Sequence, residues 1–78
     1  MKNVVLPELG EGIDKATVAC WHVQIGDRVN KDDDIVELVT DKATFNVPAD
    51  CDGTVKNIFA HEGDEIEIGK TLALIEPS

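Results

Sequence analysis

The chain of 78 residues consists of two halves with similar sequences, and this repeat constrains its fold more than any other feature. Residues 16–39 align without a gap with residues 53–76 at a constant offset of 37 positions. The identical residues are Thr17, Val18, Gly26 and Asp27, which match Thr54, Val55, Gly63 and Asp64. Elsewhere apolar residues align with apolar residues at the spacing that strands require. A domain of this length has room for one core, so both halves are expected to cover the same core.

The repeated segments have the composition of short β-strands. Runs such as TVACWHV, DIVELV, TVKNIF and TLALIE are rich in β-branched residues and are separated by Gly-Asp turns. We expect Gly26 and Gly63 to adopt positive φ angles, and the side chains of Asp27 and Asp64 to bond to nearby backbone. The sequence therefore predicts an all-β fold, a flattened barrel or two-sheet sandwich with pseudo-twofold symmetry.

The symmetry between the halves fails near the start of the chain. Residues 2–7 resemble residues 43–48 at an offset of 41, so the first half carries four additional residues between Pro7 and Thr17. The added length lies in the acidic, glycine-containing segment 8–15. A loop that is elaborated in one half only is either a surface for partner recognition or an ordinary solvated connection, and the sequence leaves both interpretations open.

Lys42 lies in a turn between two strand-like segments, residues 35–39 and 44–47. A lysine in a turn is usually a solvated side chain without a further role. The two offsets, however, place the counterpart of Lys42 at Met1 or just beyond Ser78. We therefore expect the two termini at one end of the domain and Lys42 at the other, which is where a presented side chain has to be.

Composition excludes several classes of function. The formal net charge is −9, with seven basic residues among sixteen acidic ones, so the chain lacks the basic face that nucleic-acid binding requires. No apolar stretch reaches the 18 residues or so of a membrane span, and the N-terminal apolar run is too short for a secretory signal. We expect neither a nucleic acid nor a membrane as a partner.

Other residue types that often form sites have no supporting pattern here. Cys20 and Cys51 are expected to be free thiols, although a disulfide between them stays open. The acidic run 32–34 lacks the glycine and the terminal glutamate of a calcium loop, so we interpret it as a charged turn. His22 and His61 have no partner at metal-ligand spacing, and no nucleophile or phosphate-loop motif occurs. The sequence predicts no metal site and no self-contained catalytic centre.

Three motifs together resemble one family. They are the tripeptide Asp41-Lys42-Ala43, the opening LPELGEGI at residues 6–13, and the paired G-D-x-[VI] turns at residues 26–29 and 63–66. With these motifs the chain is similar to the lipoyl domain of the dihydrolipoyl acyltransferase component of 2-oxo acid dehydrogenase complexes. The similarity covers essentially the whole chain, as a lipoyl-carrier domain at residues 1–76 followed by the start of a flexible linker at residues 77–78.

The resemblance assigns roles to the motif residues. It implies that Lys42 carries lipoic acid through an amide bond, and that Asp41 and Ala43 affect how the modified lysine is presented. It also implies that the loop after Pro7 recognises the cognate decarboxylase. The residues of that loop are Glu8, Leu9, Gly10, Glu11, Gly12 and Ile13.

The same resemblance implies the function and the partners. The lipoyl group would be reductively acylated by a thiamine-dependent 2-oxo acid decarboxylase and would deliver the acyl group to coenzyme A at an acyltransferase catalytic domain. Dihydrolipoyl dehydrogenase would then reoxidise it, and a lipoate ligase or lipoyl transferase would attach it. Such a carrier has no catalytic centre of its own, and its expected location is the bacterial cytoplasm or, after processing, an organellar matrix.

The identity of the complex is less constrained than the carrier function. The opening LPELGEGI favours a pyruvate or branched-chain complex, whereas ATVACWH favours a 2-oxoglutarate complex. We take the pyruvate dehydrogenase complex as the sequence-based expectation. The alternatives are a biotinyl carrier domain, whose lysine is typically flanked by methionines, the longer hydrogen carrier of glycine cleavage, and an acidic interaction domain without a prosthetic group.

Overall fold

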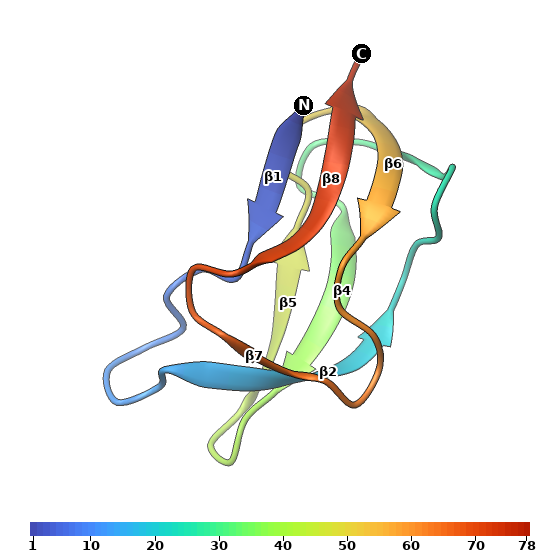
Figure 1. The fold of residues 1–78 in the computed structure, drawn as a ribbon. Coiled ribbons are helices and arrows are strands. Elements are labelled where there is room, and N and C mark those ends of the chain that lie inside the picture. Colours follow the sequence, from blue (N-terminus) through green and yellow to red (C-terminus); the bar gives the residue numbers. More distant parts are fainter.

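Eight β-strands and no helix make up the computed structural model, which describes residues 1–78. The strands are β1 (Lys2–Val5), β2 (Lys15–Trp21), β3 (Arg28–Val29), β4 (Asp34–Val39), β5 (Thr44–Pro48), β6 (Gly53–Ile58), β7 (Glu65–Glu67) and β8 (Thr71–Pro77). They form two four-stranded antiparallel sheets, in the orders β1-β8-β6-β3 and β5-β4-β2-β7 (Figure 1). The predicted all-β, two-sheet fold is confirmed. With no helix present, no segment forms a membrane-spanning helix.

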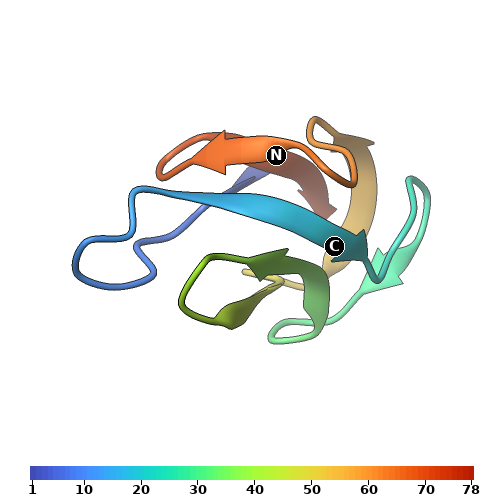
Figure 2. The same cartoon turned by 90° about the horizontal axis from the view of Figure 1, so that it is seen from below.

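The two sheets are related strand by strand, as the repeat predicts. The alignment matches β2 with β6, β3 with β7 and β4 with β8, and β5 corresponds to β1. Substituting each strand by its counterpart converts the order of one sheet into the order of the other. The view from below shows strands of both sheets surrounding a common interior (Figure 2). The pseudo-twofold symmetry is therefore a property of the fold as well as of the sequence.

Each half of the chain completes the sheet of the other half. In the first half, Gly26 N donates to Val55 O over 2.8 Å, and Val55 N donates to Asp27 O over 2.9 Å. The Gly63–Asp64 turn makes the equivalent two bonds to Val18, at 2.8 and 2.9 Å. As a result β3 pairs with β6, and β7 pairs with β2. Neither half by itself therefore provides hydrogen-bond partners for all of its backbone N–H and C=O groups.

The two Gly-Asp turns have the expected local geometry. Gly26 and Gly63 adopt φ angles of +97° and +90°, a region that favours glycine because it has no Cβ. Asp27 accepts the Gln24 N–H at Oδ2 over 2.9 Å, and Asp64 accepts the N–H three positions before it over the same distance. Both predictions for these turns are confirmed.

The core is a single apolar cluster to which both halves contribute. It contains fifteen buried residues and no buried polar side chain. Its members are Val4, Leu6, Ala16, Val18, Val29, Ile35, Val36, Leu38, Val47, Ala49, Val55, Ala60, Leu72, Ala73 and Ile75. All its members are aliphatic, and the partly buried Trp21 packs against them from outside the cluster.

The termini and the Lys42 turn lie at opposite ends of the domain. Figure 1 shows the N- and C-termini together at one end, and the turn that joins β4 to β5 at the other. This arrangement follows from the symmetry, since the chain ends occupy the position that matches the β4–β5 turn. The expected separation of Lys42 from both termini is confirmed.

Two smaller predictions are also confirmed. Cys20 and Cys51 are free cysteines, and the acidic run leads from a turn, in which Asp32 has a φ of +74°, into the start of β4 at Asp34. At the C-terminus, β8 continues to Pro77, which lies opposite Gly53.

Gly53 offers a test of how closely the strands approach one another. A Cβ added there would collide with the carbonyl oxygen of Glu76 and lie 2.7 Å from Ile75 Cγ2. We predict that Gly53→Ala lowers the free energy of unfolding by about 2 kcal/mol or more, because β8 backbone has to move. The exposed Lys56→Ala on the same strand should change it by less than about 0.5 kcal/mol. Urea denaturation of both variants measures this, and equal values would contradict the close approach.

Candidate functional site

The Lys42 turn is mounted on a hairpin whose strands are fixed by the core. In the β4–β5 pair, Val36 lies opposite Val47 and Val39 lies opposite Thr44. Val36 and Val47 are buried, and so is Leu38, two positions after Val36 on β4. A one-residue slip would expose these side chains, so the register that sets the position of the tip is strongly specified.

Thr40 organises the turn through both its backbone and its hydroxyl group. Its N–H donates to Ala43 O over 2.8 Å, and its Oγ1 donates to the same carbonyl over 3.1 Å. Thr40 Oγ1 also accepts hydrogen bonds from the backbone N–H groups of Lys42 and Ala43, each over 3.1 Å. No residue of the turn has a positive φ, which explains why it needs no glycine. The backbone on both sides of Lys42 is therefore held in one arrangement.

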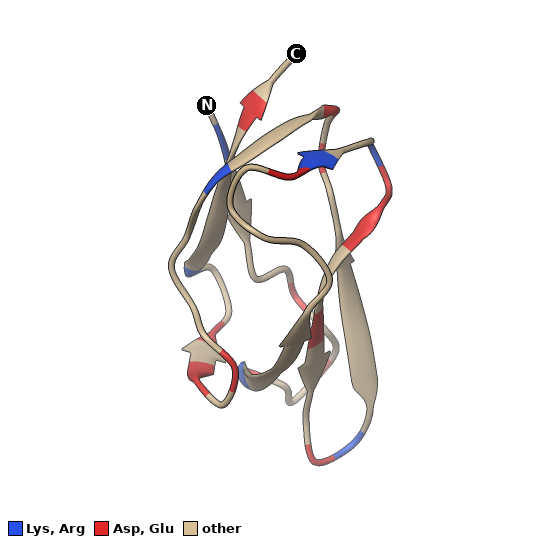
Figure 3. Cartoon of the chain, turned by 90° about the vertical axis from the view of Figure 1, so that its right-hand side faces the viewer, with Lys and Arg blue, Asp and Glu red and all other residues tan.

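The side chain of Lys42 is exposed and free of charged partners. None of the three ion pairs of the chain involves it. Its neighbours Asp41 and Ala43 are exposed as well, so the structure places the predicted tripeptide together at the tip of the hairpin. The tip carries an acidic and a basic position next to each other (Figure 3). An uncrowded primary amine of this kind is suited to acylation.

The extra loop of the first half lies beside the same hairpin. A Cβ built on Gly12 would be only 3.5 Å from Lys42 Nζ. Leu9 packs against the core and Ile13 is half-buried, whereas the remaining loop residues are exposed. Glycine at positions 10 and 12 permits φ angles of +147° and +80°. The structure thus brings together the Lys42 turn and residues 8–13, which are separated by about 30 positions in the sequence.

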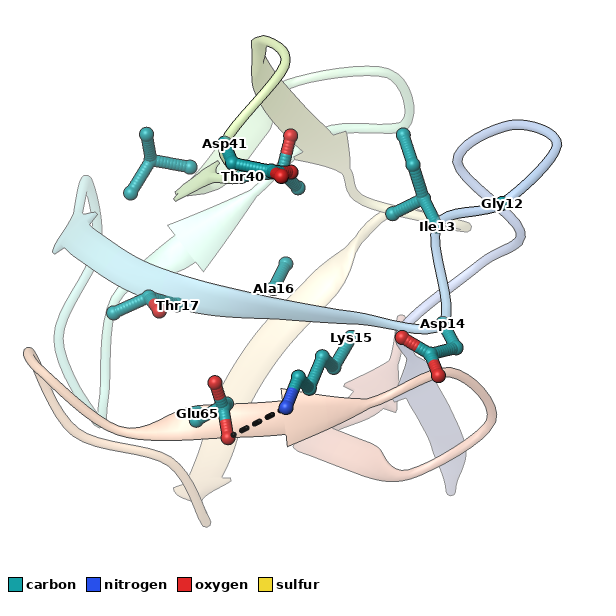
Figure 4. Close-up of a pocket in the computed structure, with 10 residues that line it drawn as sticks. Gly12, Ile13, Asp14, Lys15, Ala16, Thr17, Thr40, Asp41 and Glu65 are labelled. Atoms are coloured by element: carbon teal, nitrogen blue, oxygen red, sulfur yellow. Dashed lines mark ion pairs between the residues drawn. The ribbon is translucent and has the colours of Figure 1, made fainter.

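A groove of about 390 Å³ separates the loop from the hairpin. Ile13 and Asp14 lie on one side, Thr40 and Asp41 on the other, and Ala16 of β2 lies between them (Figure 4). An ion pair with Lys15 Nζ and Glu65 Oε1 3.4 Å apart borders it. Both partners of that ion pair are more than half exposed, so solvent screens it and it stabilises the fold little. The groove is an acidic, shallow surface rather than an enclosed catalytic pocket.

Thr40 is the site residue that sequence reasoning did not find. The sequence directed attention to the charged residues of the tip, although a threonine just before a short turn is known to bond to the backbone two and three positions ahead. That local signal could have identified it. The groove itself could not be found in the sequence, because it depends on the distance between a loop and a hairpin that are far apart in the chain.

Comparison with known proteins gives consistent results. A family model described as "Biotin-requiring enzyme", from the biotin/lipoyl family, matches residues 2–75. The chain also aligns over its full length, and over the full length of the other chain, with the lipoyl domain of the 2-oxoglutarate dehydrogenase complex from Azotobacter vinelandii. The TM-score is 0.79 and the sequence identity is 34%. The chain belongs to the lipoyl-domain branch of the biotin/lipoyl family.

Longer relatives contain this lipoyl domain as one part. The succinyltransferase component of the 2-oxoglutarate dehydrogenase complex from Staphylococcus saprophyticus is 41% identical over 75 residues, which are 96% of this chain. The lipoamide acyltransferase component of the branched-chain complex from Bacillus subtilis is 36% identical over 76 residues, or 97% of this chain. The lipoyl domain spans 18% of the length of each.

A segment of a much longer enzyme shares the fold of the lipoyl domain. The urea carboxylase from Kluyveromyces lactis superposes on 96% of the chain with a TM-score of 0.82, but on 6% of its own length and at 21% identity. This similarity shows the common architecture alone. The expectation of a pyruvate complex has no support in the relatives named above, which belong to 2-oxoglutarate and branched-chain complexes.

The role of Thr40 can be tested by removing its hydroxyl group. We predict that Thr40→Ala lowers the free energy of unfolding by about 1 kcal/mol and speeds amide hydrogen exchange at Lys42 and Ala43. Thr40→Ser should retain slow exchange because the oxygen that accepts both N–H groups is kept. Exchange monitored residue by residue by NMR measures this, and unchanged exchange in the alanine variant would show that the backbone bond alone holds the turn.

Proposed function

We propose that this lipoyl domain carries lipoic acid as an amide on Lys42 and acts as the swinging-arm acyl carrier of a 2-oxo acid dehydrogenase complex. The observation that supports it is the placement of Lys42: exposed, unpaired in charge, and at the tip of a core-anchored hairpin opposite both termini. Once attached, the lipoyl dithiolane supplies the disulfide–thiol chemistry that accepts and releases an acyl group.

The residues around Lys42 fit the attachment of a long arm. Thr40 holds the backbone of the turn, so the base of the arm keeps one position and direction. Ala43 is small, and Gly12 has no side chain to obstruct the lysine from the loop side. Amide formation removes the charge of Lys42 and leaves Asp41 as the charged group at the tip. We infer that Asp41 contributes to presentation of the arm rather than to its attachment.

The wider assembly belongs to the proposal as well. The partners are a thiamine-dependent decarboxylase, an acyltransferase catalytic domain and dihydrolipoyl dehydrogenase, with a lipoate ligase or lipoyl transferase for attachment. These partners would catalyse each step, while the domain carries the lipoyl group and contributes effective concentration through a tether that leaves the end opposite Lys42. Since β8 continues to Pro77, we place the start of that tether at Ser78, and we propose the bacterial cytoplasm as the location.

We also propose that the loop at residues 8–13 and its groove recognise the decarboxylase. The decarboxylase must approach the arm closely, and the loop is the neighbour of the hairpin at that end of the domain. Because the loop and groove are rich in carboxylates, the surface that they meet should be basic. The similar half of the chain lacks the four additional residues, so the sheets do not require that added length.

A 2-oxoglutarate complex is the assignment that the relatives favour. Both the named succinyltransferase relative and the lipoyl domain of matched length are from 2-oxoglutarate complexes. A branched-chain complex is the second candidate, because one of the named relatives belongs to such a complex. The pyruvate complex, which the opening motif suggested, is the third. Biotin is disfavoured as the prosthetic group because Asp41 and Ala43 stand where methionines are typical of biotinyl carriers.

Attachment is tested by co-expression of the chain with a lipoate ligase. We predict that intact-mass analysis shows one lipoyl addition, and that Lys42→Arg abolishes it. Lys56→Arg, at another exposed lysine, is the control and should be modified fully. An addition that survives Lys42→Arg, or no addition to the native chain, would refute the proposal.

Recognition is tested with the lipoylated domain and the decarboxylases of the 2-oxoglutarate, branched-chain and pyruvate complexes. We predict fastest reductive acylation, measured by transfer of a radioactive acyl group, with the 2-oxoglutarate decarboxylase. Deleting residues 10–12 should lower this rate at least about tenfold, equivalent to roughly 1.4 kcal/mol of transition-state binding, without affecting lipoylation. Leu9 and Ile13 are kept because they are partly buried.

The control is Glu62→Ala, which removes a carboxylate from an exposed turn outside the groove. It should leave acylation unchanged. Equal rates for the deletion variant and the native domain would show that the loop is only a connection, and preference for another decarboxylase would reassign the complex. Melting curves of both variants establish that any loss is not due to unfolding.

A further inference from the structure

Three side chains with metal-binding atoms meet on the sheet β5-β4-β2-β7. They are Cys20, His22 and Glu37, and one donor atom from each lies within 4.8 Å of the other two. Cys20 and Glu37 are half-buried, and His22 is exposed. None of the three lines the groove beside Lys42, so the cluster is a separate feature of the domain.

The register of the sheet builds this cluster from two strands. Cys20 on β2 lies directly opposite Glu37 on β4. His22 follows two positions after Cys20, and its N–H donates to Ile35 O over 2.9 Å, which continues the pairing of β2 with β4. Residues two positions apart on a strand project to the same side, so the thiol and the imidazole face the same carboxylate.

A hydrogen bond orients the histidine for ligation. His22 Nε2 lies 3.2 Å from Asn46 Oδ1 on the next strand, β5. A carbonyl oxygen has no proton to give, so Nε2–H is the donor and Nδ1 keeps its lone pair. Metal-ligating histidines commonly donate their second ring N–H to an oxygen acceptor in this way. Asn46 is itself held opposite Glu37 by the β4–β5 register.

The matching half of the domain shows that the fold does not require these residue types. The counterparts of Cys20, His22 and Glu37 are Asn57, Phe59 and Leu74. Asn57 and Leu74 lie opposite each other in β6 and β8, as Cys20 and Glu37 do in β2 and β4. The same backbone arrangement is therefore built without a thiol, an imidazole or a carboxylate.

The two cysteines also differ in their surroundings. Cys51 packs against the apolar core, whereas Cys20 does not. A cysteine that packs in a core behaves as a small apolar residue. Cys20 instead lies next to the carboxylate of Glu37 and the imidazole of His22. Its sulfur is thus available to a ligand that the histidine and glutamate can also bind.

We propose that Cys20, His22 and Glu37 form a binding site for Zn²⁺, with the fourth position open to water. A thiolate, an imidazole and a carboxylate match the preference of this borderline-soft ion, and three protein ligands are typical of an open tetrahedral site. Bond lengths of about 2.0–2.3 Å put donor atoms roughly 3.3–3.8 Å apart, so a contraction of about 1 Å completes the site. Rotation of the exposed His22 side chain can provide much of it.

Charge and proton balance are consistent with this site. The formal net charge of −9 attracts a divalent cation to the domain. On binding, the Cys20 thiol loses its proton to solvent and binds as the thiolate. The bound ion would link β2 to β4 and stabilise the sheet that carries the Lys42 hairpin.

The site is tested with the unlipoylated Lys42→Arg chain, which has no dithiol to compete for metal, under reduction by a phosphine. Co²⁺ serves as the spectroscopic probe for Zn²⁺. We expect one equivalent to bind with tetrahedral d–d bands and a thiolate-to-cobalt charge-transfer band, and Zn²⁺ to displace it. Cys20→Ser should abolish the charge-transfer band and weaken Zn²⁺ binding in calorimetry at least about tenfold.

Variants that install the matching residues of the other half separate binding from folding. His22→Phe and Glu37→Leu should each weaken Zn²⁺ binding at least about tenfold, and Asn46→Ala should weaken it by roughly 10–100-fold through loss of histidine orientation. Cys51→Ala and His61→Gln lie outside the cluster and should bind as the parent does. Melting curves without metal check that each variant is folded.

Three results would overturn the proposal. They are a cobalt spectrum without a sulfur band, unchanged affinity in both Cys20→Ser and His22→Phe, and equal losses in the Cys51→Ala control. Because every sample is unlipoylated, these results do not depend on whether Lys42 carries lipoic acid. Failure of the zinc site would leave the carrier function untouched.

Discussion

The structure depends on a reciprocal set of backbone hydrogen bonds between the two halves of the chain. The Gly26–Asp27 turn bonds to Val55, and the Gly63–Asp64 turn bonds to Val18. Val18 and Val55 are core residues, so leaving their backbone groups without partners would carry a desolvation penalty of about 1–3 kcal/mol each. Because each half supplies the partners of the other, the domain has to fold as one unit. The shared apolar core then follows from the same arrangement.

This symmetry determines which parts of the surface are available for function. The chain ends take the place that matches the β4–β5 turn, so the end of the domain that carries Lys42 is remote from both termini. The features in which the halves differ include the extra loop beside Lys42 and the donor cluster formed by Cys20, His22 and Glu37. The strand order of the sheets does not require either feature, since the sheet β1-β8-β6-β3 forms without an equivalent of them. The functional proposals therefore rest on the positions where the repeat is broken.

Much of the fold was predictable because its signals are local or periodic. The alternation of β-branched residues indicated strands, and the glycines at positions 26 and 63 indicated turns with positive φ. The repeat then supplied the long-range information that single segments lack. Thr40 was overlooked because its contribution comes from a hydroxyl group that bonds to backbone, and a sequence motif emphasises the charged neighbours instead.

The sequence by itself determined the all-β class, the paired halves, the free lysine turn and the resemblance to lipoyl domains. Each of these follows from residue type, spacing or internal similarity, and all three are properties of the linear sequence. Only the tertiary structure decided that the loop lies next to Lys42, that a groove separates them, and that Cys20 and Glu37 are opposite one another. These facts depend on strand register and on contacts between distant segments. Register is set by the sum of core packing and backbone pairing over the whole domain, and no single stretch of sequence contains it.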